Sequence, residues 1–176
     1  MRQVTRNSNS HKKRRTMLVI DCWQEMRVAG SDRTYGGETM ERPLMRMKFF
    51  LQKPSEDATV ADLAIAHDLV DTLRAHREMC AGMAANMIGQ RKRIIAVIDE
   101  DGSTVVMLNP TLMWGKDSYK TEEGCLSLVG VRPALRYARV RVRWEDEEFR
   151  PHERVFTGRV AQAIQHEIDH CNGVLI

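Results

Sequence analysis

The sequence predicts an α+β domain in which antiparallel strands lie between two helices. Three observations predict it: a helical pattern over residues 59–77, β-branched runs in the middle of the chain, and a second helical pattern near its end. Short turns join the β-branched runs, which favours antiparallel pairing over parallel pairing. A chain of 176 residues is about one domain long and can bury a substantial core.

The first predicted helix begins at Thr59. Apolar residues recur at helical spacing from Leu63 to Leu73, and Thr59 with Asp62 is typical of an N-terminal capping pair. We expect this helix to end at about Arg77.

Two β-branched runs, 93–98 and 104–108, follow the helix and predict a hairpin. Asp101-Gly102 between them is a strong turn signal, and Asn109-Pro110 is expected to end the second strand. Apolar residues then alternate with arginines over 138–144, which indicates a half-buried strand.

The chain closes with a short strand and a helix. The strand is expected around residues 154–156 and the helix over 158–172, with Gly173 as its C-terminal stop.

The uneven distribution of charge divides the chain at about residue 40. Residues 1–15 carry six of the 27 basic residues and none of the 24 acidic ones. Residues 1–40 are polar and glycine-punctuated, which predicts a basic, disordered N-terminal extension before a domain at 41–176. The arm is a solvated tail, an organelle transit peptide or a ribosome contact through Lys12-Lys13-Arg14-Arg15. Such a contact would use phosphate attraction without specific nucleic-acid recognition.

The composition excludes several classes of protein. No run approaches the roughly 18–20 apolar residues that cross a bilayer, and the N-terminus lacks the apolar core of a secretory signal. The four cysteines show no framework spacing, which argues against a disulfide scaffold. We therefore expect a cytoplasmic protein with no membrane partner.

The strongest chemical signal is the run His166-Glu167-Ile168-Asp169-His170 in the last predicted helix. Histidines four residues apart lie on one helix face, so both imidazoles can bind one metal ion. Glu167 lies between them, where it can act on a water bound to that ion. The alternative is a pair of ordinary histidines on a helix surface.

A catalytic site of this kind needs a third protein ligand and an open position for water. No Asp, Glu or His follows His170, and Cys171 lies about 100° around the helix from it. The third ligand is therefore expected upstream, and Cys125 is the candidate. The alternative is that Cys125 is a small buried apolar residue, as free cysteines often are.

Two segments of the chain resemble signature motifs of the peptide deformylase family. They are Glu123-Gly124-Cys125-Leu126-Ser127 and Gln165-His166-Glu167-Ile168-Asp169-His170, about 40 residues apart and in the family order. The resemblance covers about residues 41–176. It implies the peptide deformylase fold, with antiparallel sheets packed around a C-terminal metal-binding helix. It also implies that Cys125, His166 and His170 are the metal ligands and that Glu167 is the general acid and base.

The third family motif, G-x-G-[LM]-A-A-x-Q, reads CAGMAANM over residues 80–87. Cys80 replaces the first Gly, and Met87 replaces a Gln that in the family donates a hydrogen bond to the oxyanion. Gly82 is retained, and its lack of a side chain lets a substrate backbone approach closely. Asn86 is not expected to replace the Gln unless the backbone turns there, because neighbouring side chains on an extended segment point to opposite faces. This form is similar to a divergent deformylase-like branch of Gram-positive bacteria and their relatives.

The resemblance implies removal of the formyl group from the N-terminal methionine of nascent polypeptides. The cofactor would be one divalent metal ion, Fe²⁺ in cells, with Zn²⁺ or Ni²⁺ in oxidation-prone samples. Glu167 would move the proton of the attacking water, and the backbone N–H of Leu126 would stabilise the oxyanion. Gly82, Met87 and Arg132 are candidate residues for binding the N-formylmethionyl peptide. The alternative for Arg132 is a solvated loop arginine.

Three functions remain open from the sequence. The first is an active peptide deformylase, and the second is a deformylase-like protein with weak or redirected amidohydrolase activity. The third is a non-catalytic peptide- or ribosome-binding module. Retention of all three ligand positions and Glu167 argues against the third, and Met87 is the residue that separates the first two.

Overall fold

The computed structural model describes residues 40–176, whose strands form one antiparallel sheet in the order β1-β2-β3-β4-β5. The strands are β1 (Gly82–Ala84), β2 (Ile94–Ile98), β3 (Thr104–Cys125), β4 (Leu128–Glu145) and β5 (Pro151–Thr157). The helices are α1 (Lys48–Leu51), α2 (Leu63–Ala75) and α3 (Gly158–Cys171), with 3₁₀ turns η2 (Val60–Asp62) and η3 (Ala85–Ile88). The predicted α+β class with a C-terminal helix is confirmed. The predicted extension lies outside the described residues except for Met40.

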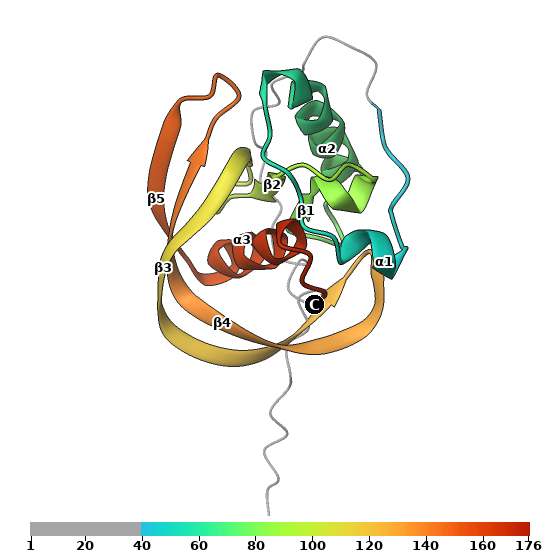
Figure 1. Cartoon of the computed structure of the whole chain (residues 1–176). Coiled ribbons are helices and arrows are strands. Elements are labelled where there is room, and N and C mark those ends of the chain that lie inside the picture. Colours follow the sequence, from blue (N-terminus) through green and yellow to red (C-terminus); the bar gives the residue numbers. More distant parts are fainter. Residues whose placement is uncertain (1–39) are drawn as a thin grey trace, which may run out of the picture.

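Helix α3 lies inside the curve of the two long strands β3 and β4 (Figure 1). One apolar core fills the space between them, with Ile164 of α3 packed among Val140, Val142 and Phe156. Removal of each such side chain from water contributes roughly 1.5–3 kcal/mol. The core therefore fixes the position of α3, which carries the predicted metal ligands.

A second core lies between α2 and the short strands. Leu69 and Leu73 of α2 pack with Met83 of β1 and Ile94 of β2. Helices α2 and α3 both contact β1 and β2, so this part of the sheet is covered from two sides.

The predicted first helix is confirmed with small differences at its ends. It begins with the turn η2, where the Asp62 carboxylate accepts hydrogen bonds from the Thr59 N–H and hydroxyl at 2.8 and 2.9 Å. These bonds satisfy donors that the start of a helix leaves without partners. Helix α2 ends at Ala75, two residues before the expected end.

The expectation that Asn109-Pro110 ends the second strand is wrong. Strand β3 continues to Cys125 across a bulge that follows Leu108. Asn109 adopts a φ of 52°, and its side-chain amide bonds to both backbone polar groups of Ala58. Pro110 is tolerated there because a bulge leaves one residue out of the hydrogen-bond ladder.

Strand β4 is also longer than expected, because it begins at Leu128 instead of Ala138. The predicted part is the part whose alternation is strict: Val140 and Val142 are fully buried, and Arg141 between them is exposed. Earlier in β4 the apolar alternation is lost, because the buried face carries Arg136 and the opposite face carries the exposed Val131 and Leu135.

The last two predicted elements are confirmed. The short strand is part of β5, and the helix is α3. Gly173 has a φ of 74°, a left-handed conformation that ends the helix as expected. Within residues 40–176, no helix is both long and apolar enough to cross a membrane.

Candidate active site

Cys125, His166 and His170 come together although they belong to different elements. Cys125 is the last residue of β3, and the two histidines lie one turn apart on α3. Their candidate donor atoms all lie within 4.8 Å of one another, and Cys125 Sγ is 3.2 Å from His170 Nε2. A thiolate and two imidazoles this close together fit one divalent transition metal ion.

The side chain of His166 is held by a buried carboxylate. Oε2 of Glu123 lies 2.9 Å from Nδ1 of His166, which leaves Nε2 free to face the thiol. Arg136 donates two further hydrogen bonds to the same carboxylate, at 2.9 and 2.8 Å, and one to Asp169 at 2.7 Å. Burial raises the pKa of Glu123, but the bonds from His166 and Arg136 outweigh it and lower the pKa to about 2. The carboxylate is therefore charged and keeps the Nδ1 proton of His166 in place.

Sequence reasoning did not assign roles to Glu123 and Arg136. Glu123 lies two residues before Cys125 within the same motif, and this position could have indicated a role beside the metal ligands. Arg136 precedes a run of alternating arginines on β4, and nothing in the sequence separates this buried arginine from its exposed neighbours.

Glu167 is buried beside the three donors, with 3% of its surface exposed. Burial raises the pKa of its carboxyl to about 7, although the charge of His166 acts in the opposite direction. A carboxyl that titrates near neutral pH is suited to accept and return a proton.

Gly82 on β1 packs directly against Glu167. A Cβ atom at this glycine would lie 3.0 Å from Cγ of Glu167 and 3.0 Å from Cγ1 of Val97. Such distances are tighter than ordinary side-chain contacts, so a Cβ atom here would push its neighbours away by a few tenths of an ångström, and glycine avoids this.

Leu126 and Arg132 lie around the connection between β3 and β4. Leu126 directly follows Cys125, is partly buried and packs against the α2 core. Arg132 is partly buried on β4 and faces Glu123 in the register of the hairpin. Its guanidinium donates a weak hydrogen bond of 3.4 Å to the carbonyl of Val129.

Asn86 and Met87 do not lie on an extended segment, contrary to the sequence expectation. They belong to the turn η3, and both are buried. The Met87 side chain packs into the α2 core, and the Asn86 amide donates a hydrogen bond of 2.7 Å to the carbonyl of His170. The amide of Asn86 is thus already engaged, although the reason differs from the one expected.

Two further cysteines lie close to the site. Burial raises the pKa of Cys80 to about 12, with smaller contributions from the charges of Glu167 and Cys125. Cys171 is fully buried and lies outside the group of metal donors, in agreement with its poor direction on the helix.

Comparison with known proteins identifies the family. The family model described as polypeptide deformylase matches residues 41–176. The chain belongs to the peptide deformylase family. A peptide deformylase of Clostridium beijerinckii is 44% identical over 137 residues, which cover 78% of this chain and 100% of the relative. The peptide deformylase of a Picosynechococcus species is 34% identical over 137 residues, covering 73% and 72% of the two chains.

Solved structures of peptide deformylases share the fold. The crystal structure of a peptide deformylase from Legionella pneumophila has a TM-score of 0.69 and 30% identity, covering 77% of this chain and 83% of the other. The crystal structure from Thermotoga maritima has a TM-score of 0.68 and 26% identity, covering 77% and 94%. The predicted deformylase fold is therefore confirmed.

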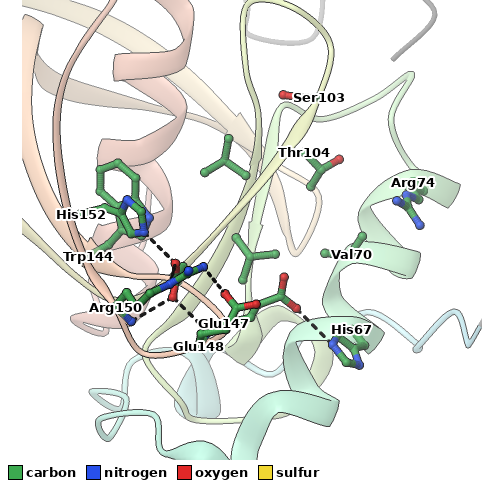
Figure 2. A pocket seen from close by; sticks show the side chains of 13 residues that line it. His67, Val70, Arg74, Ser103, Thr104, Trp144, Glu147, Glu148, Arg150 and His152 are labelled. Atoms are coloured by element: carbon green, nitrogen blue, oxygen red, sulfur yellow. Dashed lines mark hydrogen bonds and ion pairs between the residues drawn. The ribbon is translucent and has the colours of Figure 1, made fainter. Parts of the chain in front are cut away.

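A separate hollow of about 620 Å³ lies between α2, the start of β3 and the turn after β4 (Figure 2). His67 of α2 reaches across it to Glu147, with 3.1 Å between Nε2 and Oε1. None of the deformylase site residues described above lines this hollow.

Proposed function

We propose that this chain is an active peptide deformylase that removes the formyl group from the N-terminal methionine of nascent polypeptides. The observation that carries the proposal is the convergence of Cys125, His166 and His170 beside the buried carboxyl of Glu167. Membership of the family supports the same reaction.

We propose that Cys125, His166 and His170 hold one divalent ion, Fe²⁺ in cells, with Zn²⁺ or Ni²⁺ as replacements. Their soft thiolate and imidazole donors suit all three ions. When bound, the ion supplies Lewis-acid chemistry that lowers the pKa of a water from 15.7 to about 7.

The residues of the chain then move the proton and bind the peptide. Glu167 accepts the proton of the attacking water and returns it to the leaving amine, a task that its raised pKa favours. The backbone N–H of Leu126 donates to the oxyanion, since this residue directly follows Cys125.

The free edge of β1 is the proposed substrate groove. Among residues 40–176, strand β1 is at the end of the sheet and pairs only with β2, so an extended formyl-Met peptide can add to its other edge. Gly82 allows the peptide backbone to approach Glu167, and Arg132 is a candidate for binding the far end of the substrate.

We propose that the enzyme acts in the cytoplasm, where reducing conditions keep the thiol of Cys125 available as a ligand. Contact with ribosomes through the basic residues 1–15 is also a proposal. Because it would depend on phosphate attraction, it should weaken steeply as the salt concentration rises.

The test is release of formate from a formyl-Met tripeptide by anaerobically prepared protein whose metal content is measured. The matched control is the acetyl-Met tripeptide, in which a methyl group replaces the hydrogen on the acyl carbon. Turnover of the formyl peptide alone supports the proposal. Absence of formate from fully metal-loaded protein would exclude it.

A further inference from the structure

The two histidines of the candidate site are held in different ways. Nδ1 of His166 is bonded to Glu123, whereas Nδ1 of His170 is buried and has no hydrogen-bond partner among residues 40–176. A metal-binding histidine usually donates its second ring N–H to a carboxylate or a carbonyl, which fixes the ring. The position of His170 must therefore be set through another part of the residue.

Another element of the fold holds His170 through its backbone carbonyl. Nδ2 of Asn86 donates a hydrogen bond of 2.7 Å to this oxygen, across 84 residues of sequence. The same oxygen accepts a bond of 3.1 Å from the N–H of Gly173, at the end of α3. Asn86 thus joins the last turn of α3 to η3.

The surroundings of Asn86 indicate that the hydrogen bond to His170 is the main role of its side chain. The side chain is fully buried, and its Oδ1 has no hydrogen-bond partner in the described part of the chain. A buried polar atom without a partner is costly and calls for an explanation. An apolar residue of the same size would fill the space without leaving a buried oxygen unpaired. The presence of asparagine is therefore explained if its hydrogen bond to His170 is required.

We propose that Asn86 is a positioning residue that fixes His170 for metal binding through the backbone of α3. This inference rests on the proposed metal site. Residue 86 and residue 87 then have separate tasks in η3. Asn86 holds the metal-binding helix, and Met87 fills the core beneath it.

The test compares the full chain with Asn86→Ala and with Asn86→Leu, which keeps the volume but lacks the donor. Asn172→Ala is the matched control, because Asn172 is exposed at the same helix end and bonds Arg93 instead of a ligand. The proteins are loaded with Co²⁺, and the absorption spectrum and the rate of Co²⁺ loss to an excess of chelator are measured. We expect Co²⁺ loss to be about 10–100 times faster in both Asn86 variants, with an altered spectrum, and unchanged in Asn172→Ala.

Two other results would count against the proposal. Asn86 variants with the parental rate and spectrum would overturn it. A lower melting temperature of the metal-free Asn86 variants with an unchanged rate of Co²⁺ loss would assign Asn86 a structural role only, and would also overturn it. A parental chain that bound no Co²⁺ would instead overturn the proposed metal site on which the inference rests.

Discussion

Glu123 and His166 are 43 residues apart in the sequence, and a hydrogen bond of 2.9 Å joins Oε2 of one to Nδ1 of the other. The carboxylate is fully buried, and Arg136 neutralises it by donating a hydrogen bond to each of its two oxygens. The bond fixes which ring nitrogen of His166 carries the proton. We therefore expect the metal affinity of the proposed site to depend on Glu123, which is not itself one of the three candidate ligands.

Glu123→Gln should lower the metal affinity by about 10–100-fold, because a neutral amide holds the Nδ1 proton of His166 less strongly. Competition with a chelator of known affinity measures the change. Glu122→Gln is the matched control, since Glu122 is the exposed neighbour and should keep the parental affinity. Equal affinities for all three proteins would show that the bond to His166 does not tune the site.

Glu167→Gln should keep the metal ion and lose hydrolysis. In the proposed mechanism Glu167 moves a proton and is not one of the three metal donors, so the rate should fall by at least about 10²–10⁴-fold. Metal content and formate release are measured on the same sample. Near-parental turnover would contradict the proton-transfer role of Glu167.

Met87→Gln should raise kcat on formyl-Met peptides at constant metal content. A thioether cannot donate a hydrogen bond, and removal of one oxyanion donor typically costs ~2.7–4 kcal/mol, or roughly 10²–10³ in kcat. We expect the lower end of this range, because a metal ion bound at the proposed site would itself stabilise the oxyanion. Met87→Leu is the control without a donor, and its kcat should stay at the parental value. An unchanged or lower kcat in Met87→Gln would show that another group already serves the oxyanion.

Gly82→Ala should lower both stability and activity. The added Cβ would lie 3.0 Å from Cγ of Glu167, so either β1 or the Glu167 side chain must move by a few tenths of an ångström. Such overpacking typically costs about 1–3 kcal/mol in the free energy of unfolding, which denaturant titration measures. Gly158→Ala is the control, because its φ of 56° strains a side chain but no atom lies within 4 Å of the added Cβ. Its kcat should stay parental, and equal kcat losses in the two variants would contradict the account.

The sequence predicted helix α3 well because several local signals agree there. The helical pattern, the stop at Gly173 and the spacing of His166 and His170 all depend on residues close together in the chain. The alternation at Val140 and Val142 was readable for a similar reason: one face of β4 is buried there and the other is exposed.

The parts that sequence reasoning missed depend on distant contacts. The bulge at Asn109 is held by Ala58, which is 51 residues away. Because this contact cannot be seen in the local sequence, Asn109-Pro110 was predicted to end the strand. Asn86 turns inward in η3 and bonds His170, whereas the motif alone suggested an extended segment. Arg136 becomes a buried partner of Glu123 only because β3 and β4 pair as a long hairpin.

The most direct test of the account is the X-ray absorption spectrum of the chain loaded with Zn²⁺. The central claim is that Cys125, His166 and His170 together hold the ion. The account predicts one sulfur neighbour at about 2.3 Å and two imidazole nitrogens at about 2.0–2.1 Å, with the sulfur lost in Cys125→Ser. A first shell of nitrogen and oxygen alone in the parental protein would contradict it.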